Sequence, residues 1–335
     1  MSVRSESRLT PLLADVDWQP ALDAIAAAER IVLITHCTPD GDGIGSQMAL
    51  YEALLAAGKA VRMHNRDGVP RIYQFLTHAD QVTQGDFRGG GVDLIIALDC
   101  GARGRLGMPD AFYAGAPLLN IDHHASNKRF GDINLVDARY CATGAMMFDL
   151  LIAMGQPLTA TMAQAIYVAV MTDTASFRLS SATAAVYRMA ADLIDAGAEP
   201  WPISVQVYES RSHSGLKMLT ACLDTLAFRD GGRSAWIFVD RDMYENSGAD
   251  VEDTEGLIDY ARSVDGVEVA VFIRCDETRD GYWKVSFRGK TWADVGALAA
   301  ELGGGGHKHA AGCVMQGTLA SVRTQVEQAV ARLLH

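Results

Sequence analysis

The sequence predicts an α/β protein with two domains, a larger one built on a parallel sheet and a smaller α+β domain that follows it. Between residues 15 and 197, short apolar runs alternate with segments of helical spacing, and this order is typical of a parallel sheet with helices on both faces. After Gly197 the pattern changes to paired strands followed by helices. The length of 335 residues also exceeds that of one average domain.

In the first domain, the predicted strands are short runs rich in apolar and β-branched residues. They lie at residues 31–35 (IVLIT), 61–65 (VRMHN), 93–99 (DLIIALD) and 117–122 (PLLNID). The predicted helices carry apolar residues three or four positions apart, as at Ile44, Met48, Tyr51 and Leu55. They are expected at residues 15–30, 43–57, 142–154, 159–171 and 183–196.

Residues 198–214 are predicted to connect the domains, because they contain two prolines and the polar stretch YESRSHSG. The second domain, residues 215–335, begins with a predicted hairpin around the glycine pair at 231 and 232. Strands at 267–277 and 281–289, a helix at 292–302, a strand at 310–315 and a helix at 319–334 follow. This mixture predicts an α+β unit.

The net charge of −12 disfavours a protein that grips long duplex nucleic acid, which normally requires a basic surface. A small phosphorylated ligand is compatible with it, because bound cations can supply the attraction. The apolar runs are strand-sized and the N-terminus lacks the apolar core of a signal peptide, so no membrane association is predicted. The six cysteines include no C-x-x-C pair, and a cytoplasmic protein with free thiols is expected.

The first predicted strand is followed at once by His36, Asp40 and Asp42. Because loops at the carboxyl ends of strands form the ligand crevice of an open α/β sheet, these side chains can converge on one point. The interleaved glycines at 41, 43 and 45 would let the chain turn tightly. The structural alternative is a turn followed by a helix with Asp42 as its N-cap.

The same segment partly matches a dinucleotide-binding fingerprint. Its third glycine position is Ser46, however, and Asp40 and Asp42 would repel a pyrophosphate unless cations neutralised them. A metal site is therefore the favoured interpretation.

Three later segments carry the same types of side chain. Asp99 closes the third strand, Asp122 closes the fourth and is followed by His123 and His124, and Asp173 lies at the end of a predicted helix. Each could be an ordinary turn or cap residue by itself. Four segments that deliver carboxylate or imidazole to one edge of a sheet make that explanation weak for the group.

The segments HCTPDGDGIGS, ALDCG, IDHHASN and MTDTASF resemble, in order and spacing, the four motifs of the DHH phosphoesterase family. The run GGGGHKHAAG at 303–312 resembles the signature of the DHH-associated C-terminal domain. The length and residues 253–274 look most similar to the nano-RNase/pAp-phosphatase branch. One departure is His309, because the family commonly carries arginine there and a fixed charge becomes a titratable one.

The resemblance implies a pair of divalent cations. One ion would be held by His36, Asp40 and Asp99. The second would share Asp99 and take the remaining ligands, which are Asp42, His123 and Asp173. Oxygen-rich ligation with some imidazole suits Mn²⁺, which is the expected ion, or Mg²⁺, with Co²⁺ as a further alternative.

Two catalytic residues are implied beside these ions. His124 is expected to contact the phosphoryl oxygens or to protonate the leaving group. Asp122 is expected to orient a neighbouring side chain, and a simple strand-end cap is an equally open alternative. Two ions about 3.5–4 Å apart can generate a hydroxide and clamp the attacking oxygen.

Substrate contacts are predicted in the second domain, so that a short substrate would lie between the two domains. The backbone of four consecutive glycines could approach an anion closely, and the alternative is a flexible connection. The predicted substrate-binding residues are Gly303, Gly304, Gly305, Gly306, His307, His309 and Arg288. Weaker candidates near the motifs are Arg103, Arg105, Lys128 and Arg178.

The leading hypothesis is an enzyme that hydrolyses short oligoribonucleotides to mononucleotides, with 3′-phosphoadenosine 5′-phosphate as an additional substrate. A phosphodiesterase for linear or cyclic signalling dinucleotides would use the same site and is the first alternative. A nucleotide-binding regulatory module is the second, but a complete acidic cluster speaks against it because uncompensated carboxylates are costly. A homodimer remains an open alternative for the assembly.

Overall fold

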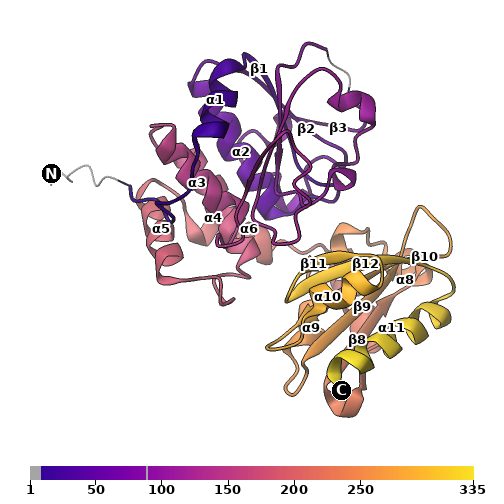
Figure 1. The fold of residues 1–335 in the computed structure, drawn as a ribbon. Helices are drawn as coiled ribbons and strands as arrows, with labels where there is room; N and C mark the ends of the chain where they lie inside the picture. The colour runs from indigo at the N-terminus through magenta and orange to yellow at the C-terminus, as the bar shows by residue number, and fades with distance from the viewer. Residues whose placement is uncertain (1–8, 88–89) are drawn as a thin grey trace. The chain divides into compact units, whose positions relative to one another are not determined.

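The structure is a computed structural model that describes residues 9–87 and 90–335. The chain divides into two compact units, one that ends at Ser210 and one that comprises Arg211–His335 (Figure 1). The division falls inside residues 198–214, which the sequence marks as a connection. The prediction that no targeting segment begins the chain concerns in part residues 1–8, which lie outside the described residues.

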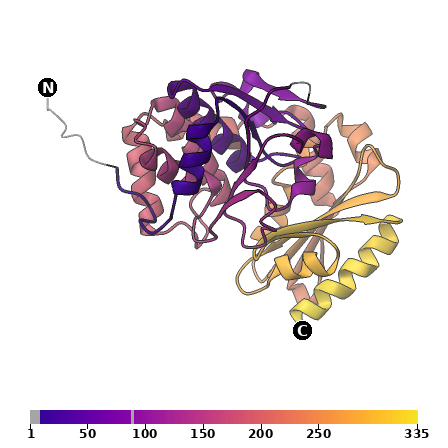
Figure 2. The same ribbon diagram turned by 45° about the horizontal axis from the view of Figure 1, so that its top comes forward.

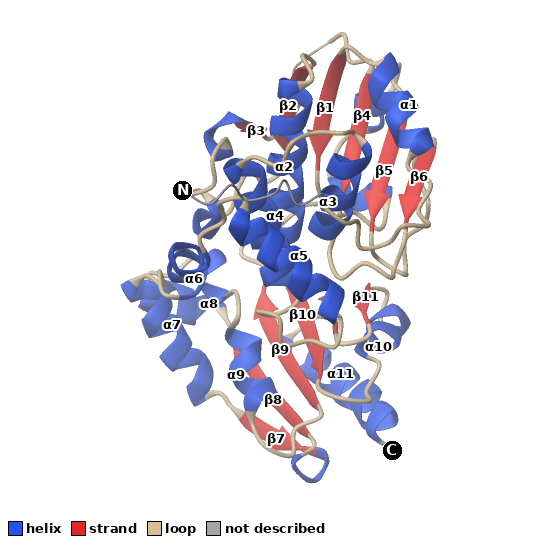
Figure 3. Ribbon diagram, turned by 90° about the vertical axis from the view of Figure 1, so that its left-hand side faces the viewer, coloured by secondary structure: helices blue, strands red, loops and turns tan. Residues whose placement is uncertain are grey.

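The first unit is built on a parallel sheet. Its strands are β1 (Arg30–Ile34), β2 (Ala60–Asn65), β3 (Val82–Gln84), β4 (Leu94–Leu98), β5 (Leu118–Asp122) and β6 (Ile133–Val136). They lie in the order β3-β2-β1-β4-β5-β6, and every neighbouring pair is parallel, as the aligned arrows in Figure 3 show. The order reverses between β1 and β4, which is where ligands bind in sheets of this kind.

Long helices cover one face of this sheet. The helices of the first unit are α1 (Gln19–Ala27), α2 (Gly41–Ala56), α3 (Thr143–Ala153), α4 (Ala160–Asp173), α5 (Ala184–Asp195) and α6 (Pro200–Tyr208). Helices α2, α3 and α4 share a core with Ile31 and Leu33 of β1. The alternate residues Val32 and Ile34 face the other way, because side chains alternate along a strand.

The opposite face of the sheet is covered mainly by short elements. Its core includes Leu106 and the partly buried Phe112 and Tyr113, from the 3₁₀-helices η3 (Arg103–Leu106) and η4 (Asp110–Tyr113). Two more 3₁₀-helices, η1 (Arg71–Tyr73) and η2 (Ala79–Gln81), lie between β2 and β3. The α/β fold class is confirmed, and the helices on this second face are single turns.

The three glycines after the first strand serve packing, which differs from the tight turn expected of them. They lie inside α2 and none has a positive φ. A Cβ added at Gly45 would overlap the carbonyl oxygen of Ala165 in α4, and one at Gly43 would overlap the hydroxyl of Thr35. These glycines therefore let α2 lie close to α4 and to the end of β1.

The second unit contains a mixed sheet. Its strands are β7 (Ala227–Arg229), β8 (Ser234–Val239), β9 (Val269–Cys275), β10 (Tyr282–Gly289), β11 (Gly305–His307) and β12 (Ala310–Gln316). The order is β11-β12-β10-β9-β8-β7, and only the β8–β9 pair is parallel. The register pairs Arg288 of β10 with Ala310 of β12.

Helices flank this second sheet as well. They are α7 (His213–Asp224), α8 (Arg241–Ser247), α9 (Leu257–Ser263), α10 (Val295–Glu301) and α11 (Leu319–Leu334); three-residue 3₁₀ turns occur at Asp230–Gly232 and Glu252–Thr254. The C-terminal helix α11 packs along one face through Val322, Val326 and Val330, beside Val271 and Phe287 (Figure 2). In the part of the chain that is described, every helix is too short or too polar to cross a bilayer.

Candidate metal centre

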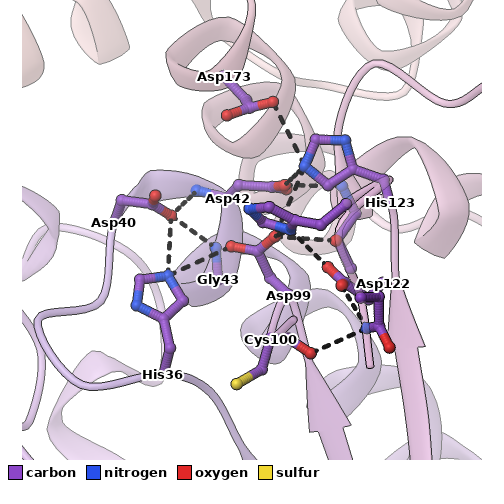
Figure 4. A network of polar contacts seen from close by, with 12 residues as sticks. His36, Asp40, Asp42, Gly43, Asp99, Cys100, Asp122, His123 and Asp173 are labelled. Atoms are coloured by element: carbon purple, nitrogen blue, oxygen red, sulfur yellow. Dashed lines mark hydrogen bonds and ion pairs between the residues drawn. The ribbon is translucent and has the colours of Figure 1, made fainter. Parts of the chain in front are cut away.

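The acidic and imidazole side chains come from the ends of strands and helices at one edge of the parallel sheet. His36 follows β1, Asp99 follows β4, and His123 follows β5. Asp42 lies in the first turn of α2 and Asp173 is the last residue of α4. Figure 4 shows these side chains turned toward one another. The sequence-predicted residues of the first domain are therefore brought together.

Asp40, and not Asp42, is the N-cap of α2. Its side chain accepts hydrogen bonds of 3.1 Å from the backbone amides of Asp42 and Gly43. This cap leaves the carboxylate of Asp42 available elsewhere. It accepts the amides of Thr143 at 2.7 Å and Gly144 at 2.8 Å, which begin α3. The start of α3 therefore fixes the orientation of Asp42 and compensates part of its charge.

His36 presents one ring nitrogen to two carboxylates. Its Nε2 lies 3.4 Å from Asp99 Oδ2 and 3.8 Å from Asp40 Oδ1 (Figure 4). Its Nδ1 lies 2.8 Å from the carbonyl oxygen of Cys37. Because a carbonyl only accepts hydrogen bonds, Nδ1 must carry the proton, and the lone pair of the neutral ring is on Nε2. This tautomer suits a metal ligand.

His123 presents its Nε2 to three carboxylates. The distances are 3.5 Å to Asp42 Oδ2, 3.7 Å to Asp99 Oδ1 and 3.5 Å to Asp173 Oδ2 (Figure 4). Its Nδ1 faces the carbonyl oxygen of Tyr140 at 3.4 Å. The two oxygens of Asp99 thus point to different imidazoles, Oδ2 to His36 and Oδ1 to His123. Asp99 has the geometry of a bridging carboxylate.

The closeness of these carboxyl groups to one another shifts their pKa values. Burial, followed by the charges of Asp99 and Asp173, raises the pKa of Asp42 well above its usual value. Burial and the charge of Asp99 raise the pKa of Asp173 to about 6, against the opposing effect of His123. Burial also raises the pKa of Asp99, but the neighbouring imidazoles outweigh it and the net shift is downward. The cluster therefore carries more negative charge than its own histidines compensate.

This donor set fits divalent cations. Three groups in the first unit have ligand atoms within 4.8 Å of one another, and Asp99 belongs to each of them. The groups are His36, Asp40 and Asp99; Asp42, Asp99 and His123; and Asp99, Asp122 and His124. Carboxylate oxygens with imidazole nitrogens are ligands of Mg²⁺ and Mn²⁺, and thiolate is not among them. Bound cations would also compensate the repulsion that raises the pKa of Asp42 and Asp173.

Asp122 and His124 form a hydrogen-bonded pair beside this cluster. His124 Nδ1 lies 2.7 Å from Asp122 Oδ1, and the other oxygen of Asp122 accepts the side-chain amide of Asn127 at 2.5 Å. Burial lowers the pKa of His124, but Asp122 and then Asp99 outweigh it and raise that pKa to about 9. Asp122 therefore orients His124 and favours its protonated form.

The predicted substrate-binding residues of the second unit differ in their environments. The amides of Gly303 and Gly304 donate to the carbonyl oxygens of Ala300 and Ala299 and close the end of α10. Gly305 begins the edge strand β11, so the expected loop is partly strand. The two amides that cap the helix are already used, and the anion-binding role of the glycines stays a prediction.

The histidine and arginine candidates of the second unit lie near the same strands. His307 ends β11, and Arg288 lies in β10. His309 follows β11, and its Nδ1 is buried with no hydrogen-bond partner among the described residues. A buried polar atom of this kind is costly unless a ligand or water satisfies it. This observation keeps His309 a candidate for substrate contact.

Sequence reasoning missed two residues that hold the centre together. The Thr143 hydroxyl donates to Asp99 Oδ1 at 3.1 Å, and Asn127 holds Asp122. Thr143 lies at the start of a predicted helix, and helix N-termini commonly bind anions, so that signal was available. Asn127 belongs to the quoted segment IDHHASN, but its partner could be identified only from the fold.

Comparison with protein families identifies both units. The DHH family, N-terminal domain, matches residues 30–170, and the DHHA1 domain matches residues 237–334. The first match contains the β1, β4 and β5 edge of the sheet, and the second contains the glycine-rich run.

Two curated relatives carry the same name, bifunctional oligoribonuclease and PAP phosphatase NrnA. The protein of Thermus thermophilus is 33% identical over 288 residues, which cover 86% of this chain and 84% of that protein. The protein of Bacillus subtilis is 25% identical over 291 residues, which cover 86% and 90%.

Solved structures share the fold. An exopolyphosphatase-related protein from Bacteroides fragilis has a TM-score of 0.86 and 25% identity, with 96% of this chain and 98% of that chain covered. RecJ from Thermus thermophilus has a TM-score of 0.52 at 14% identity, with 97% of this chain and 56% of that chain covered. The second likeness extends to the fold alone.

Proposed function

This chain belongs to the DHH family of phosphoesterases, and from that premise we propose that it hydrolyses short oligoribonucleotides to mononucleotides with two divalent cations. The names of the relatives from Thermus thermophilus and Bacillus subtilis support this substrate class. They also support 3′-phosphoadenosine 5′-phosphate as a second substrate. Location in the cytoplasm and assembly as a homodimer remain predictions.

The observation that carries the proposal is the shared position of Asp99. It belongs to each of the three potential ligand groups of the first unit, and its two oxygens face His36 and His123 at 3.4 and 3.7 Å. A carboxylate shared by two ligand sets can hold two ions close together, which is the arrangement that two-ion hydrolysis of a phosphate ester uses. We propose His36 and Asp40 as the remaining ligands of one ion. Those proposed for the second ion are Asp42, His123 and Asp173.

The bound cations, with Mn²⁺ as the proposed ion, would supply Lewis-acid charge to the phosphoryl oxygens and lower the pKa of the attacking water. The protein side chains position these groups. His36 and His123 are oriented by the carbonyl oxygens of Cys37 and Tyr140 at 2.8 and 3.4 Å. Such contacts fix the ring that ligates a metal.

His124 is the proposed general acid for the leaving oxygen. Asp122, 2.7 Å away, outweighs the effect of burial and raises the pKa of His124 to about 9, which favours its protonated form. In this role Asp122 orients the imidazole and does not contact the substrate. The substrate contacts proposed in the second unit are the glycine run, His307, His309 and Arg288.

The decisive experiment replaces Asp99 by Asn. We expect Mn²⁺-dependent release of mononucleotides from a dinucleotide to fall by at least about 100-fold, because both cations lose a ligand. Asp110→Asn is the matched control. The Asp110 side chain is fully exposed, and it forms a long ion pair of 3.5 Å with Arg103. The panel should extend from dinucleotides to longer RNA, and include 3′-phosphoadenosine 5′-phosphate and cyclic dinucleotides.

Turnover by Asp99→Asn at the rate of the Asp110→Asn control would contradict the proposed centre. Binding of nucleotides by the unaltered protein without product, whichever divalent cation is supplied, would support a binding module instead. Metal content measured on both variants tests for loss of the ions, and their circular dichroism spectra test for loss of the fold.

A further inference from the structure

Arg105 is held in a fixed place beside the proposed metal ligand His36. It lies in the 3₁₀-helix η3, whose last residue, Leu106, is fully buried. The carbonyl oxygen of Arg105 accepts the amide of Cys37 at 2.7 Å. The backbone of Arg105 is therefore fastened to the loop that carries His36.

The guanidinium of Arg105 lies next to an atom that cannot accept its hydrogen bond. One terminal nitrogen is 3.4 Å from His36 Nδ1. That Nδ1 is also 2.8 Å from the carbonyl oxygen of Cys37, to which it must donate its own proton. Arg105 therefore keeps its donors for another partner, and its side chain is exposed.

Neighbouring arginines at the same edge of the sheet are paired. Arg66 lies 2.5 Å from Asp86, and Arg103 lies 3.5 Å from Asp110 and stacks on Tyr113 at 4.1 Å. Arg105 forms no ion pair with any carboxylate in residues 9–87 or 90–335. It is a cation with unused hydrogen-bond donors at the border of a strongly acidic cluster, where an anionic ligand is the natural partner.

The position of Arg105 relative to His36 indicates which anion Arg105 would bind. Nε2 of His36 faces Asp40 and Asp99, where the scissile phosphate would bind, whereas Arg105 is on the Nδ1 side of the ring. We propose that Arg105 binds a second phosphate of the substrate, next to the scissile one, and so favours nucleotides that carry two phosphates. This inference rests on the proposed function and names a specificity-determining residue within it.

The test compares two substrates that differ only in the second phosphate, diadenylate with and without a 5′-phosphate. Arg105→Gln should raise KM for the phosphorylated dinucleotide by roughly 10- to 100-fold, as expected for a lost charged hydrogen bond. KM for the unphosphorylated dinucleotide should change by less than about twofold. Arg105→Lys should fall between these values, because lysine keeps the charge but not the paired donors.

Arg66→Gln is the matched control, because Arg66 lies at the same edge of the sheet and is already paired with Asp86 at 2.5 Å. It should leave the ratio of the two KM values unchanged. Mn²⁺ affinity should be the same in all variants. An equal loss on both dinucleotides, or a weakened Mn²⁺ affinity, would mean that Arg105 acts through His36, and the inference would be wrong.

A binding measurement separates this inference from the proposed function. Calorimetric titration in Ca²⁺ compares 3′-phosphoadenosine 5′-phosphate with adenosine 5′-monophosphate. The unaltered protein should bind the ligand with two phosphates more tightly. In Arg105→Gln the ratio of the two affinities should fall by about 10-fold or more. Failure of the unaltered protein to hydrolyse any dinucleotide would overturn the proposed function alone. If the unaltered protein and Arg105→Gln showed the same preference for the ligand with two phosphates, the proposed role of Arg105 would be overturned.

Discussion

The backbone of Asp99 is in the left-handed region, with φ of 52°. Among residues other than glycine, Asp and Asn adopt this conformation with the least difficulty. The Thr143 hydroxyl holds one oxygen of the carboxylate at 3.1 Å. Local strain of this kind persists where surrounding contacts enforce it, and it is typical of functional sites. Asparagine is therefore the appropriate replacement, because it removes the charge and retains the backbone preference.

Replacing Asp122 by Asn should lower kcat and leave metal binding intact. The carboxylate is buried and hydrogen-bonded to His124 and Asn127. Without its charge the pKa of His124 should fall, and the fraction of protonated acid with it. We expect a loss of roughly 10- to 100-fold in kcat. Mn²⁺ affinity, measured by calorimetry, tests the assignment, because a parallel loss would make Asp122 a ligand.

Metal binding should release protons at neutral pH. Burial disfavours the charged form of His36, but Asp40 and Asp99 outweigh it and raise the pKa of that imidazole to about 10. The pKa of Asp173 is about 6. Ligation by His36 and Asp173, as proposed above, would require a neutral imidazole and an ionised carboxylate, so protons would compete with the cation and affinity should fall as the pH falls. The Mn²⁺ binding enthalpy should therefore vary with the ionisation enthalpy of the buffer, and an enthalpy independent of buffer would contradict this account.

At the level of elements, the close approach of α2 and α4 depends on Gly45. Gly45→Ala should destabilise the protein by about 1–3 kcal/mol, because the new methyl group would overlap the carbonyl oxygen of Ala165. Gly104→Ala is the control, since a Cβ there has no atom within 4 Å, and it should change stability by less than about 0.5 kcal/mol. Urea denaturation measures both. Equal midpoints would show that the helices can separate without cost.

In the second unit, Glu268 holds the segment that precedes α10. Its carboxylate accepts the amides of Thr291, Trp292 and Ala293 at 3.0, 2.8 and 2.9 Å. Burial raises the pKa of Glu268, but these hydrogen bonds outweigh it and the net shift is downward. A carboxyl group with a lowered pKa stabilises the fold above its ordinary pKa, and that stability is lost as the pH falls through the lowered value.

Glu268→Gln should therefore destabilise the protein near neutral pH by about 1–3 kcal/mol. The difference between the two proteins should shrink as the pH falls below the ordinary glutamate pKa of 4.5. Thermal unfolding from about pH 7 to about pH 3 measures this convergence. Parallel curves over the whole range would show that the charge of Glu268 does not contribute.

Several elements were predictable from the sequence because their apolar spacing is long and regular. Helix α11 has the predicted bounds, and α3, α4 and α5 begin and end within two residues of them. Strands β3 and β6 were missed because they are only three and four residues long and partly exposed. Part of the segment predicted as a connection forms helix α6. Its two prolines lie in the first turn, where the missing amide costs no helical hydrogen bond.

For the molecule as a whole, the net charge of −12 predicts that long nucleic acids are poor ligands. We expect no detectable binding of long duplex RNA at physiological salt, because phosphate contacts and counterion release normally supply that affinity. A gel-shift assay with a duplex and with a short single strand provides the comparison. A stable complex with the duplex would require a basic surface strong enough to overcome the overall charge.

The candidate centre was predictable as a group of residues, and its geometry was not. Spacing and strand ends identified His36, Asp99 and His123, because a parallel sheet gathers the carboxyl ends of its strands. The hydrogen bond from Thr143 to Asp99 and the contact of Arg105 with His36 link residues 44 and 69 positions apart. Such contacts depend on the crossovers of the chain, which no local pattern encodes.

The contact between α2 and α4 also bears on ion selectivity. Asp42 lies one turn before Gly45 in α2, and Asp173 lies one turn after Ala169 in α4, beside the same contact. The separation of the two helix axes therefore sets the room between these carboxylates. A side chain at position 45 would widen it and favour cations of larger radius such as Ca²⁺ over Mn²⁺. In the proposed centre, discrimination between ions would thus depend on a glycine that is not itself a ligand.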